Sequence, residues 1–170
     1  MRAILALSAL VSLTVACGGG SPTSPSPGSL TPLPPASPGT FLSRGTMSAA
    51  VDGTRWEATT PTALVGAFAG LTSLSGTASL GGLRIYMALP AAVGTYTLSP
   101  TSLVSCSVSE NLATRYWLAS PFTTGSICTV TVTTHTPTRV AGVFSFTAVS
   151  GPGVSPASRT VTDGTFDLSQ

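Results

Sequence analysis

Apolar and polar residues alternate in short runs along the chain from residue 41 to the C-terminus. In residues 127–134, for example, Cys128, Val130 and Val132 alternate with threonines. A period of two places successive side chains on opposite faces of a strand, and no stretch shows the 3.6-residue period of an amphipathic helix. The runs recur about every ten residues and are separated by Gly, Pro, Asp and Ser, which is typical of β-sandwiches. We therefore predict an all-β, antiparallel β-sandwich of roughly ten short strands.

Two Asp-Gly pairs mark special backbone positions in this pattern. Asp52-Gly53 separates two alternating runs, which predicts a β-hairpin with a type I′ turn. Asp163-Gly164 falls inside the last run, 159–168, where it predicts either a turn or a β-bulge.

The alternation also predicts which side chains form the core. The inward-facing positions of the clearest runs are Met47, Ala49, Val51, Leu83, Ile85, Met87, Leu89, Cys128, Val130, Val132, Val140, Gly142, Phe144, Phe146, Ala148, Phe166 and Leu168.

The N-terminus has the pattern of a secretory signal. Arg2 precedes an apolar run, 3–16, which is shorter than the roughly 20 residues that span a membrane as a helix. The run ends in Leu-Thr-Val-Ala-Cys at 13–17, which resembles a bacterial lipobox; the resemblance implies that Cys17 is lipidated and becomes the new N-terminus. The alternative is ordinary cleavage after Ala16, which would leave Cys17 as a free thiol.

A Pro-, Ser- and Gly-rich segment follows Cys17. Such a composition cannot bury apolar surface and favours extended, disordered chain. We therefore divide the chain into a lipoprotein signal peptide (1–16), a lipidated cysteine with a disordered linker (17–40) and a β-sandwich domain (41–170). This organisation predicts an exported protein, anchored by lipid to the cell envelope. Gly18, in place of an Asp after the cysteine, resembles lipoproteins that are sent to the outer membrane.

Four segments of the predicted domain carry a family resemblance. Residues 52–56 (DGTRW), 93–98 (VGTYTL), 140–148 (VAGVFSFTA) and 160–167 (TVTDGTFD) resemble an uncharacterised family of bacterial secreted and lipoprotein β-domains. The resemblance covers about residues 45–168. It implies an exported β-domain and assigns no catalytic or binding residue.

Only 7% of the chain is charged, against about 25% in a typical soluble domain. The seven cations are arginines spread along the chain without a cluster. Nucleic acid binding requires several cations on one face, so this pattern argues against a nucleic acid partner. The strands instead present Thr and Ser where most domains present Lys and Glu.

Two cysteines remain once Cys17 is assigned to lipid. Cys106 and Cys128 both occupy the apolar face of a predicted strand, and an exported protein meets an oxidising compartment, so we expect a disulfide between them. Two buried free thiols are the alternative.

The ionisable residues form no recognisable catalytic or metal-binding motif. The single histidine, His135, has no acidic residue near it in sequence, and we interpret it as a solvated turn residue. Asp163 and Asp167 could contribute to a calcium site with loop carbonyls, but no Ca²⁺-binding loop motif surrounds them. We therefore expect no catalytic residues, no metal and no cofactor.

Aromatic residues offer the best candidates for ligand contact. Tyr116 and Trp117 are adjacent, so on a strand one ring faces inward and the other can be exposed to stack on a ligand. Trp56, beside Glu57, is a further candidate for stacking. For all three, ordinary core or rim packing is the alternative.

These features favour a membrane-anchored cell-envelope lipoprotein whose β-sandwich domain is non-enzymatic and has a binding or structural role. The expected partners are the membrane, through the lipid anchor, and an unidentified protein or glycan. The alternative is an envelope carbohydrate-binding module or a glycan hydrolase that uses some of the five carboxylates.

Overall fold

Strands, turns and loops make up the part of the chain that the computed structural model describes, residues 39–68, 70–78, 82–110 and 114–170. No helix capable of crossing a membrane occurs among these residues. The predicted signal peptide, Cys17 and nearly all of the predicted linker lie outside the described residues.

Twelve β-strands follow one another from Thr40 onward. They are β1 (Thr40–Leu42), β2 (Arg44–Val51), β3 (Thr54–Glu57), β4 (Thr62–Phe68), β5 (Leu71–Thr77), β6 (Arg84–Pro90), β7 (Gly94–Thr97), β8 (Ser105–Glu110), β9 (Arg115–Ala119), β10 (Ile127–Thr136), β11 (Arg139–Ser150) and β12 (Ser158–Ser169).

All twelve strands belong to one hydrogen-bonded sheet with antiparallel pairing. The order is β1-β4-β5-β6-β8-β9-β11-β12-β2-β3, and β10 branches from β11 and pairs with β7 at its other edge. The expectation of an all-β antiparallel fold is confirmed. The structure has twelve strands where the spacing of apolar runs predicts roughly ten, and the three-residue strand β1 is too short to show alternation.

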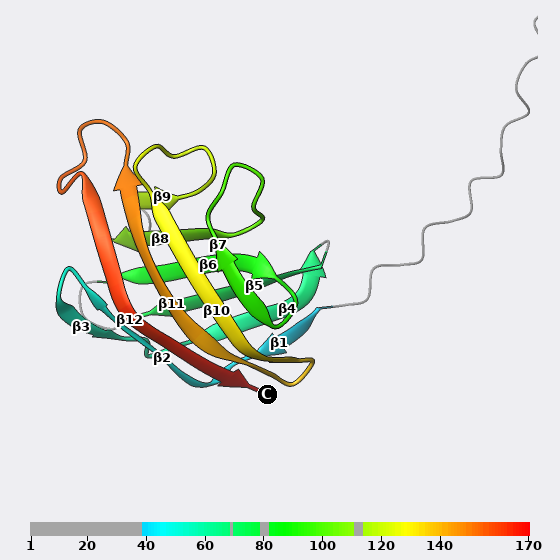
Figure 1. Ribbon diagram of the computed structural model, residues 1–170. Helices are drawn as coiled ribbons and strands as arrows, with labels where there is room; N and C mark the ends of the chain where they lie inside the picture. Colours follow the sequence, from blue (N-terminus) through cyan, green and yellow to red (C-terminus); the bar gives the residue numbers. More distant parts are fainter. Residues whose placement is uncertain (1–38, 69, 79–81, 111–113) are drawn as a thin grey trace, which may run out of the picture. The chain divides into compact units, whose positions relative to one another are not determined.

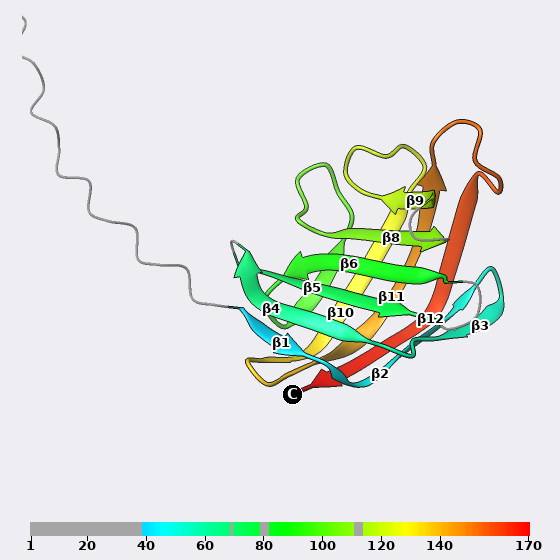
Figure 2. The same cartoon turned by 180° about the vertical axis from the view of Figure 1, so that it is seen from behind.

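The sheet folds over so that its strands form two facing layers (Figures 1 and 2). The long strands β10, β11 and β12 run side by side in one layer, and β4, β5, β6 and β8 cross behind them. Ser43 alone separates β1 from β2, so the chain passes directly from pairing with β4 to pairing with β12. The Ser43 backbone N–H donates to the Ser169 carbonyl at 3.1 Å, which joins the layers at this corner.

One apolar core fills the space between the layers. The alternating positions that the sequence assigns to the core are buried, including Ile85, Met87 and Leu89 of β6 and Phe144 and Phe146 of β11. The exception is Leu83, which precedes β6 and is only half-buried against the core. At about 25 cal/mol per Å² of apolar surface, each fully buried Leu or Phe side chain contributes about 2 kcal/mol to folding. Strand alternation thus places the apolar side chains inward and hydroxyl side chains on the opposite face, although Thr72, Ser107 and Ser109 are buried.

Both Asp-Gly pairs adopt the backbone conformations that the sequence predicts. Asp52 and Gly53 have φ angles of 49° and 77° and connect β2 to β3 as a two-residue hairpin turn. Asp163, with φ of 51°, lies within β12, where the pairing with both β11 and β2 shifts register. Of the two alternatives at Asp163-Gly164, the structure contains the bulge.

Candidate functional site

An open groove of about 580 Å³ lies beside the β2–β3 hairpin. Ligand pockets of small molecules commonly have volumes of 300–1,000 Å³, so the groove is large enough for one. One wall is β3 with the adjoining Asp52 and Thr59, and the other is formed by Ala78, Leu83 and Arg159.

Trp56 forms the apolar base of the groove. Its side chain is buried, with 5% of its surface exposed, and its indole N–H donates a hydrogen bond to the Leu83 carbonyl at 3.1 Å. Behind the ring lies Gly76, where a Cβ atom would come within 2.9 Å of the indole. The ring is therefore fixed in place, and only a small part of it is available for contact with a ligand.

The rim of the groove carries charges that neutralise one another. Arg55 and Glu57 point outward from the same face of β3 and form an ion pair, with Arg55 Nε 3.0 Å from Glu57 Oε1. Hydrogen bonding to Glu57 raises the pKa of Arg55, so this guanidinium stays charged. The pair leaves donors and acceptors side by side at the rim without net charge.

Asp52 connects the hairpin turn to the start of β12. One carboxylate oxygen accepts a hydrogen bond from the Thr160 N–H at 2.8 Å, and the other accepts one from Arg159 Nη1 at 2.6 Å. The turn residue that the sequence predicts for backbone reasons therefore also orients Arg159 at the end of the groove.

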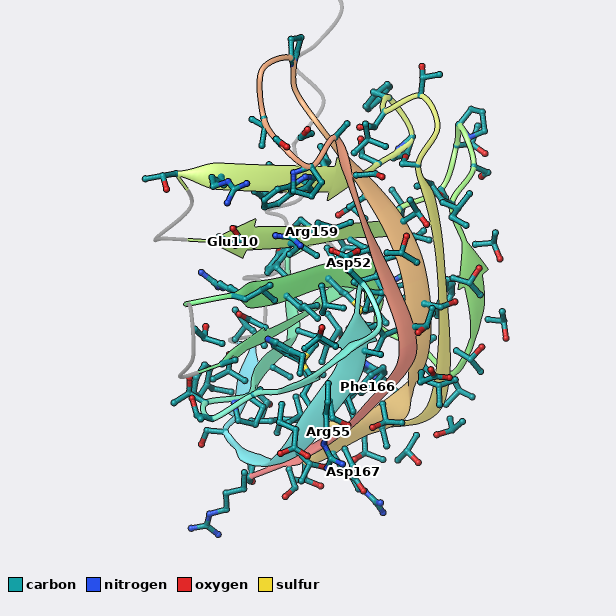
Figure 3. The ribbon with its side chains drawn as sticks, turned by 90° about the vertical axis from the view of Figure 1, so that its left-hand side faces the viewer. Asp52, Arg55, Glu110, Arg159, Phe166 and Asp167 are labelled. Atoms are coloured by element: carbon teal, nitrogen blue, oxygen red, sulfur yellow. A yellow bond between two sulfur atoms is a disulfide. The ribbon has the colours of Figure 1, made fainter. Side chains whose placement is uncertain are left out.

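Arg159, which lines one end of the groove, is the centre of a network of charges. Its guanidinium contacts both Asp52 and Glu110, and Arg115 Nη1 bonds the second Glu110 oxygen at 3.0 Å. Figure 3 shows Asp52, Glu110 and Arg159 at one place, where β8, β12 and the β2–β3 turn meet. The side chains of Arg159 and Glu110 are only 18% and 15% exposed, so this network is mostly shielded from water.

Trp117 lies beneath this network and is completely buried. The guanidinium carbons of Arg159 and Arg115 lie 4.8 Å and 5.4 Å from the centre of its ring, and its N–H donates to the Pro156 carbonyl at 2.7 Å. The proposed role of Trp117 in stacking on a ligand does not fit this position, because the ring faces the core and has no free surface.

Tyr116 faces the opposite way and is 45% exposed. It lines a shallower hollow with Phe122 and Val149, separate from the groove at Trp56. The two aromatic residues that the sequence leaves as accessible candidates, Tyr116 and Trp56, are thus not brought together in one site.

The expected disulfide is present between Cys106 of β8 and Cys128 of β10, with an S–S distance of 2.06 Å. Both cysteines face the core, as their strand positions predict, and both are completely or almost completely buried. The alternative of two free thiols is therefore wrong.

A family model covers the segment in which the sequence motifs lie, and it confirms that this segment belongs to an uncharacterised family. Residues 43–167 match the model of the family described as a domain of unknown function, DUF6252. The chain belongs to this family. No curated protein and no solved structure matches the chain.

Within the DUF6252 domain, His135 is not the solvated turn residue that its sequence neighbours suggest. It lies in β10 opposite Val140 and is half-buried, and its Nε2 atom is 2.8 Å from the hydroxyl oxygen of the buried Thr72 in β5. Burial lowers the pKa of the imidazole below its ordinary value of 6.5. The strand continues past His135 to Thr136, so the turn begins later than the Thr-His-Thr-Pro sequence indicates.

The two aspartates of β12 have different environments. Asp167 accepts two hydrogen bonds from Arg139, at 2.9 Å and 2.7 Å, and these bonds lower the pKa of its carboxyl. Asp163 accepts a bond from the Thr162 hydroxyl at 3.1 Å. The two carboxylates thus have separate partners, and Arg139 bonds both oxygens of Asp167. No group of three metal-ligating side chains occurs among the residues that the structure describes.

The arginine network of the DUF6252 domain could not be found from the sequence. Asp52, Glu110, Arg115 and Arg159 are separated by up to 107 positions, and no local motif connects them. The only sequence signal for this network is the predicted hairpin, because it places Asp52 in a turn at the end of two strands. Arg159 joins Glu110 and Arg115 only because the sheet folds over.

Proposed function

We propose that this protein is a lipid-anchored lipoprotein of the cell envelope whose DUF6252 domain is a non-enzymatic binding domain. The sequence supports the anchor: the signal pattern, the lipobox-like segment ending at Cys17 and the Pro-rich linker are those of a tethered domain. The pattern at Gly18 supports the outer membrane as the destination.

The observation that carries the non-enzymatic assignment is the arginine pairing of the carboxylates. Four of the five carboxylates in the chain, Asp52, Glu57, Glu110 and Asp167, bond to an arginine. A glycosidase requires one carboxyl that carries a proton to the leaving group and a second that acts as nucleophile or base. Asp52 and Glu110 approach the same guanidinium, but their oxygens are occupied by arginine donors and are not free for such a reaction.

A neutral, hydroxyl-rich ligand such as a glycan is the occupant that the groove beside Trp56 favours. Sugar hydroxyls both donate and accept hydrogen bonds, and the Arg55–Glu57 pair offers donors and acceptors together at the rim. Leu83 and the small accessible part of Trp56 give the base of the groove an apolar surface that suits the C–H face of a sugar ring. A charged ligand would have to displace one member of the ion pair.

Lipidation is tested in a bacterium that has the lipoprotein-processing machinery. We expect the full chain to incorporate labelled palmitate and to sediment with the outer membrane, and the Cys17→Ser variant to lose both properties. A Cys106→Ser variant is the matched control, since its cysteine is far from the processing site and the label should remain. Soluble, unlabelled wild-type protein would refute the anchor.

Glycan binding is tested by titrating the purified protein with soluble oligosaccharides from envelope and plant polysaccharides, monitored by NMR. We expect shifts at the groove that weaken about tenfold in Arg55→Ala, because several hydrogen bonds at the rim are lost. Arg44→Ala, on an exposed arginine outside the groove lining, is the matched control. Release of new reducing ends that disappears in Glu110→Gln would instead identify a hydrolase.

A further inference from the structure

Three loops at one end of the domain contain no charged residue. They connect β7 to β8 (98–104), β9 to β10 (120–126) and β11 to β12 (151–157), and both ribbon views place them together at the same end (Figures 1 and 2). Their residues are Ser, Thr, Pro, Gly, Ala and a few large apolar side chains. The charged network around Arg159 is internally paired, so it presents no excess of either sign.

Large apolar side chains project from this end into solvent. Phe122 is 94% exposed, and Leu103 and Ile127 are each 65% exposed. Tyr116, beside Phe122 in the same hollow, is 45% exposed. Single exposed apolar residues are common, and Phe41, Tyr86, Val93 and Val143 are exposed outside these loops. The three most exposed large apolar side chains of the described residues nevertheless gather at this end, which indicates an interaction surface. We call Leu103, Tyr116, Phe122 and Ile127 the apolar tip.

The disulfide fixes the bases of the two loops that carry most of the apolar tip. Cys106 follows Leu103 by three residues and Cys128 directly follows Ile127, so the Cys106–Cys128 bond joins the ends of both loops. The Leu98 N–H also donates to the Cys128 carbonyl at 2.8 Å. Within the second loop, the Thr123 N–H donates to Ser120 and the Ser126 hydroxyl donates to Thr123. The tip is therefore held in place before any partner binds, which lowers the entropic cost of binding.

We propose that the apolar tip docks this domain onto a lipid bilayer, with Phe122 and Leu103 inserted at the level of the headgroups and upper acyl chains. The tip consists of separate apolar side chains on adjacent loops, surrounded by small uncharged polar residues, and it offers no charged group for a partner to match. Specific protein interfaces combine a packed apolar patch with a polar rim that fixes orientation. A bilayer requires only apolar insertion and the absence of charges that would have to be dehydrated.

The absence of charge in these loops also indicates that the bilayer surface need not be anionic. Peripheral proteins that recognise anionic lipids carry clusters of Lys and Arg, each of which adds to the attraction. The three loops have no cation, so docking depends on apolar burial and is independent of anionic lipid and of salt. This docking requires neither the groove at Trp56 nor lipidation of Cys17, and it would hold a tethered domain in a defined orientation.

The test uses a tryptophan placed on the tip of the full-length chain and vesicles of phosphatidylcholine with brominated acyl chains, which quench tryptophan on contact. We expect the emission of Phe122→Trp to shift to the blue and to fall by about half. Phe41→Trp is the matched control, because Phe41 is 59% exposed on β1, away from these loops (Figure 1). Both variants share residues 1–40 and the buried Trp56 and Trp117, so these contribute equally to both signals.

Equal quenching of Phe122→Trp and Phe41→Trp, or quenching of neither, would overturn the proposal. This is also the result expected if the tip binds a protein instead of a bilayer. Added phosphatidylglycerol or high salt should change the quenching of Phe122→Trp by less than about 20%, and a strong dependence on either would also contradict it. Replacing Leu103 with Ser in the Phe122→Trp background should reduce the quenching several-fold. The groove variant Arg55→Ala should leave it unchanged, which separates this result from failure of glycan binding.

Discussion

Glu110 of β8 and Arg159 of β12 form an ion pair between two strands that are not neighbours in the sheet. Each side chain is less than one-fifth exposed, and each has a further partner, Arg115 for Glu110 and Asp52 for Arg159. Because the network spans the folded-over sheet beside Trp117, it fixes how the two layers meet at the groove end of the domain.

The Glu110→Gln variant should therefore lose about 2 kcal/mol of unfolding free energy. Removing one partner of a shielded ion pair leaves the other charge uncompensated, here the two arginines beside Trp117. The measurement is urea unfolding followed by tryptophan fluorescence. Glu57→Gln is the matched control on an exposed pair and should change stability by less than about 0.5 kcal/mol. Equal effects of the two substitutions would show that the network around Arg159 is no more than a surface ion pair.

Replacing both disulfide cysteines with serine should destabilise the domain by about 3 kcal/mol, because the bond closes a loop between positions 22 residues apart. Chemical unfolding of the double variant against the oxidised wild type measures this loss. Reduction of the wild-type protein should give a loss of the same order, and a reductant should have no effect on the double variant. A stability unaffected by either change would contradict the role that we give to the bond.

Stability should fall as the pH is lowered from about 7 to about 5. The folded state lowers the pKa of His135 by burial, so the unfolded chain binds a proton below pH 6.5 that the folded chain takes up only at lower pH. Stability rises with pH wherever the unfolded state binds more protons, so this contribution is complete above pH 6.5 and decreases below it. Unfolding midpoints measured between pH 5 and 8 test the slope. In His135→Gln, which keeps a side-chain hydrogen-bonding group near Thr72, the slope should be absent from this window.

Gly142→Ala should destabilise the domain by about 3 kcal/mol. A Cβ at this position of β11 would meet the Thr131 carbonyl oxygen at 2.1 Å and the Phe166 ring at 2.7 Å, so β10 and β12 would have to move. Gly151→Ala, in the β11–β12 loop, is the control, because a Cβ there meets nothing within 4 Å. Thermal unfolding of the two variants, compared with the wild type, should separate them clearly. A mild effect at Gly142 would mean that the strands approach one another less closely than described.

Local sequence pattern was sufficient for the strands whose side chains alternate strictly. In β10, Cys128, Val130 and Val132 are buried as predicted, because alternation on a half-buried strand leaves a single inward face. The Asp52-Gly53 turn was equally predictable, since few residue pairs tolerate positive φ at both positions. The short strand β1 was missed, because three residues are too few to show a period.

The sequence predicted the candidate site only in part, because strand alternation does not say which of two adjacent side chains faces the core. Adjacent strand residues must face opposite ways, so the sequence could state that one of Tyr116 and Trp117 is inside, but not which one. That choice depends on the core that Trp117 fills and on the arginines that cover it. The neighbours of His135 in the sequence suggest a turn. Its contact with Thr72 arises only because β5 lies close to β10 in the folded protein.

The sequence by itself determined the class of fold, the inward faces of the clearest strands and the Asp52-Gly53 hairpin turn, and it led us to expect the Cys106–Cys128 bond. Each of these follows from the chemistry of neighbouring residues along the chain or from the count of cysteines. The tertiary structure alone decided the groove beside Trp56, the four-membered network around Arg159 and the gathering of Leu103, Phe122 and Ile127 at one end. These depend on how a single sheet folds over on itself, which brings together residues that are tens of positions apart and have no pattern in common.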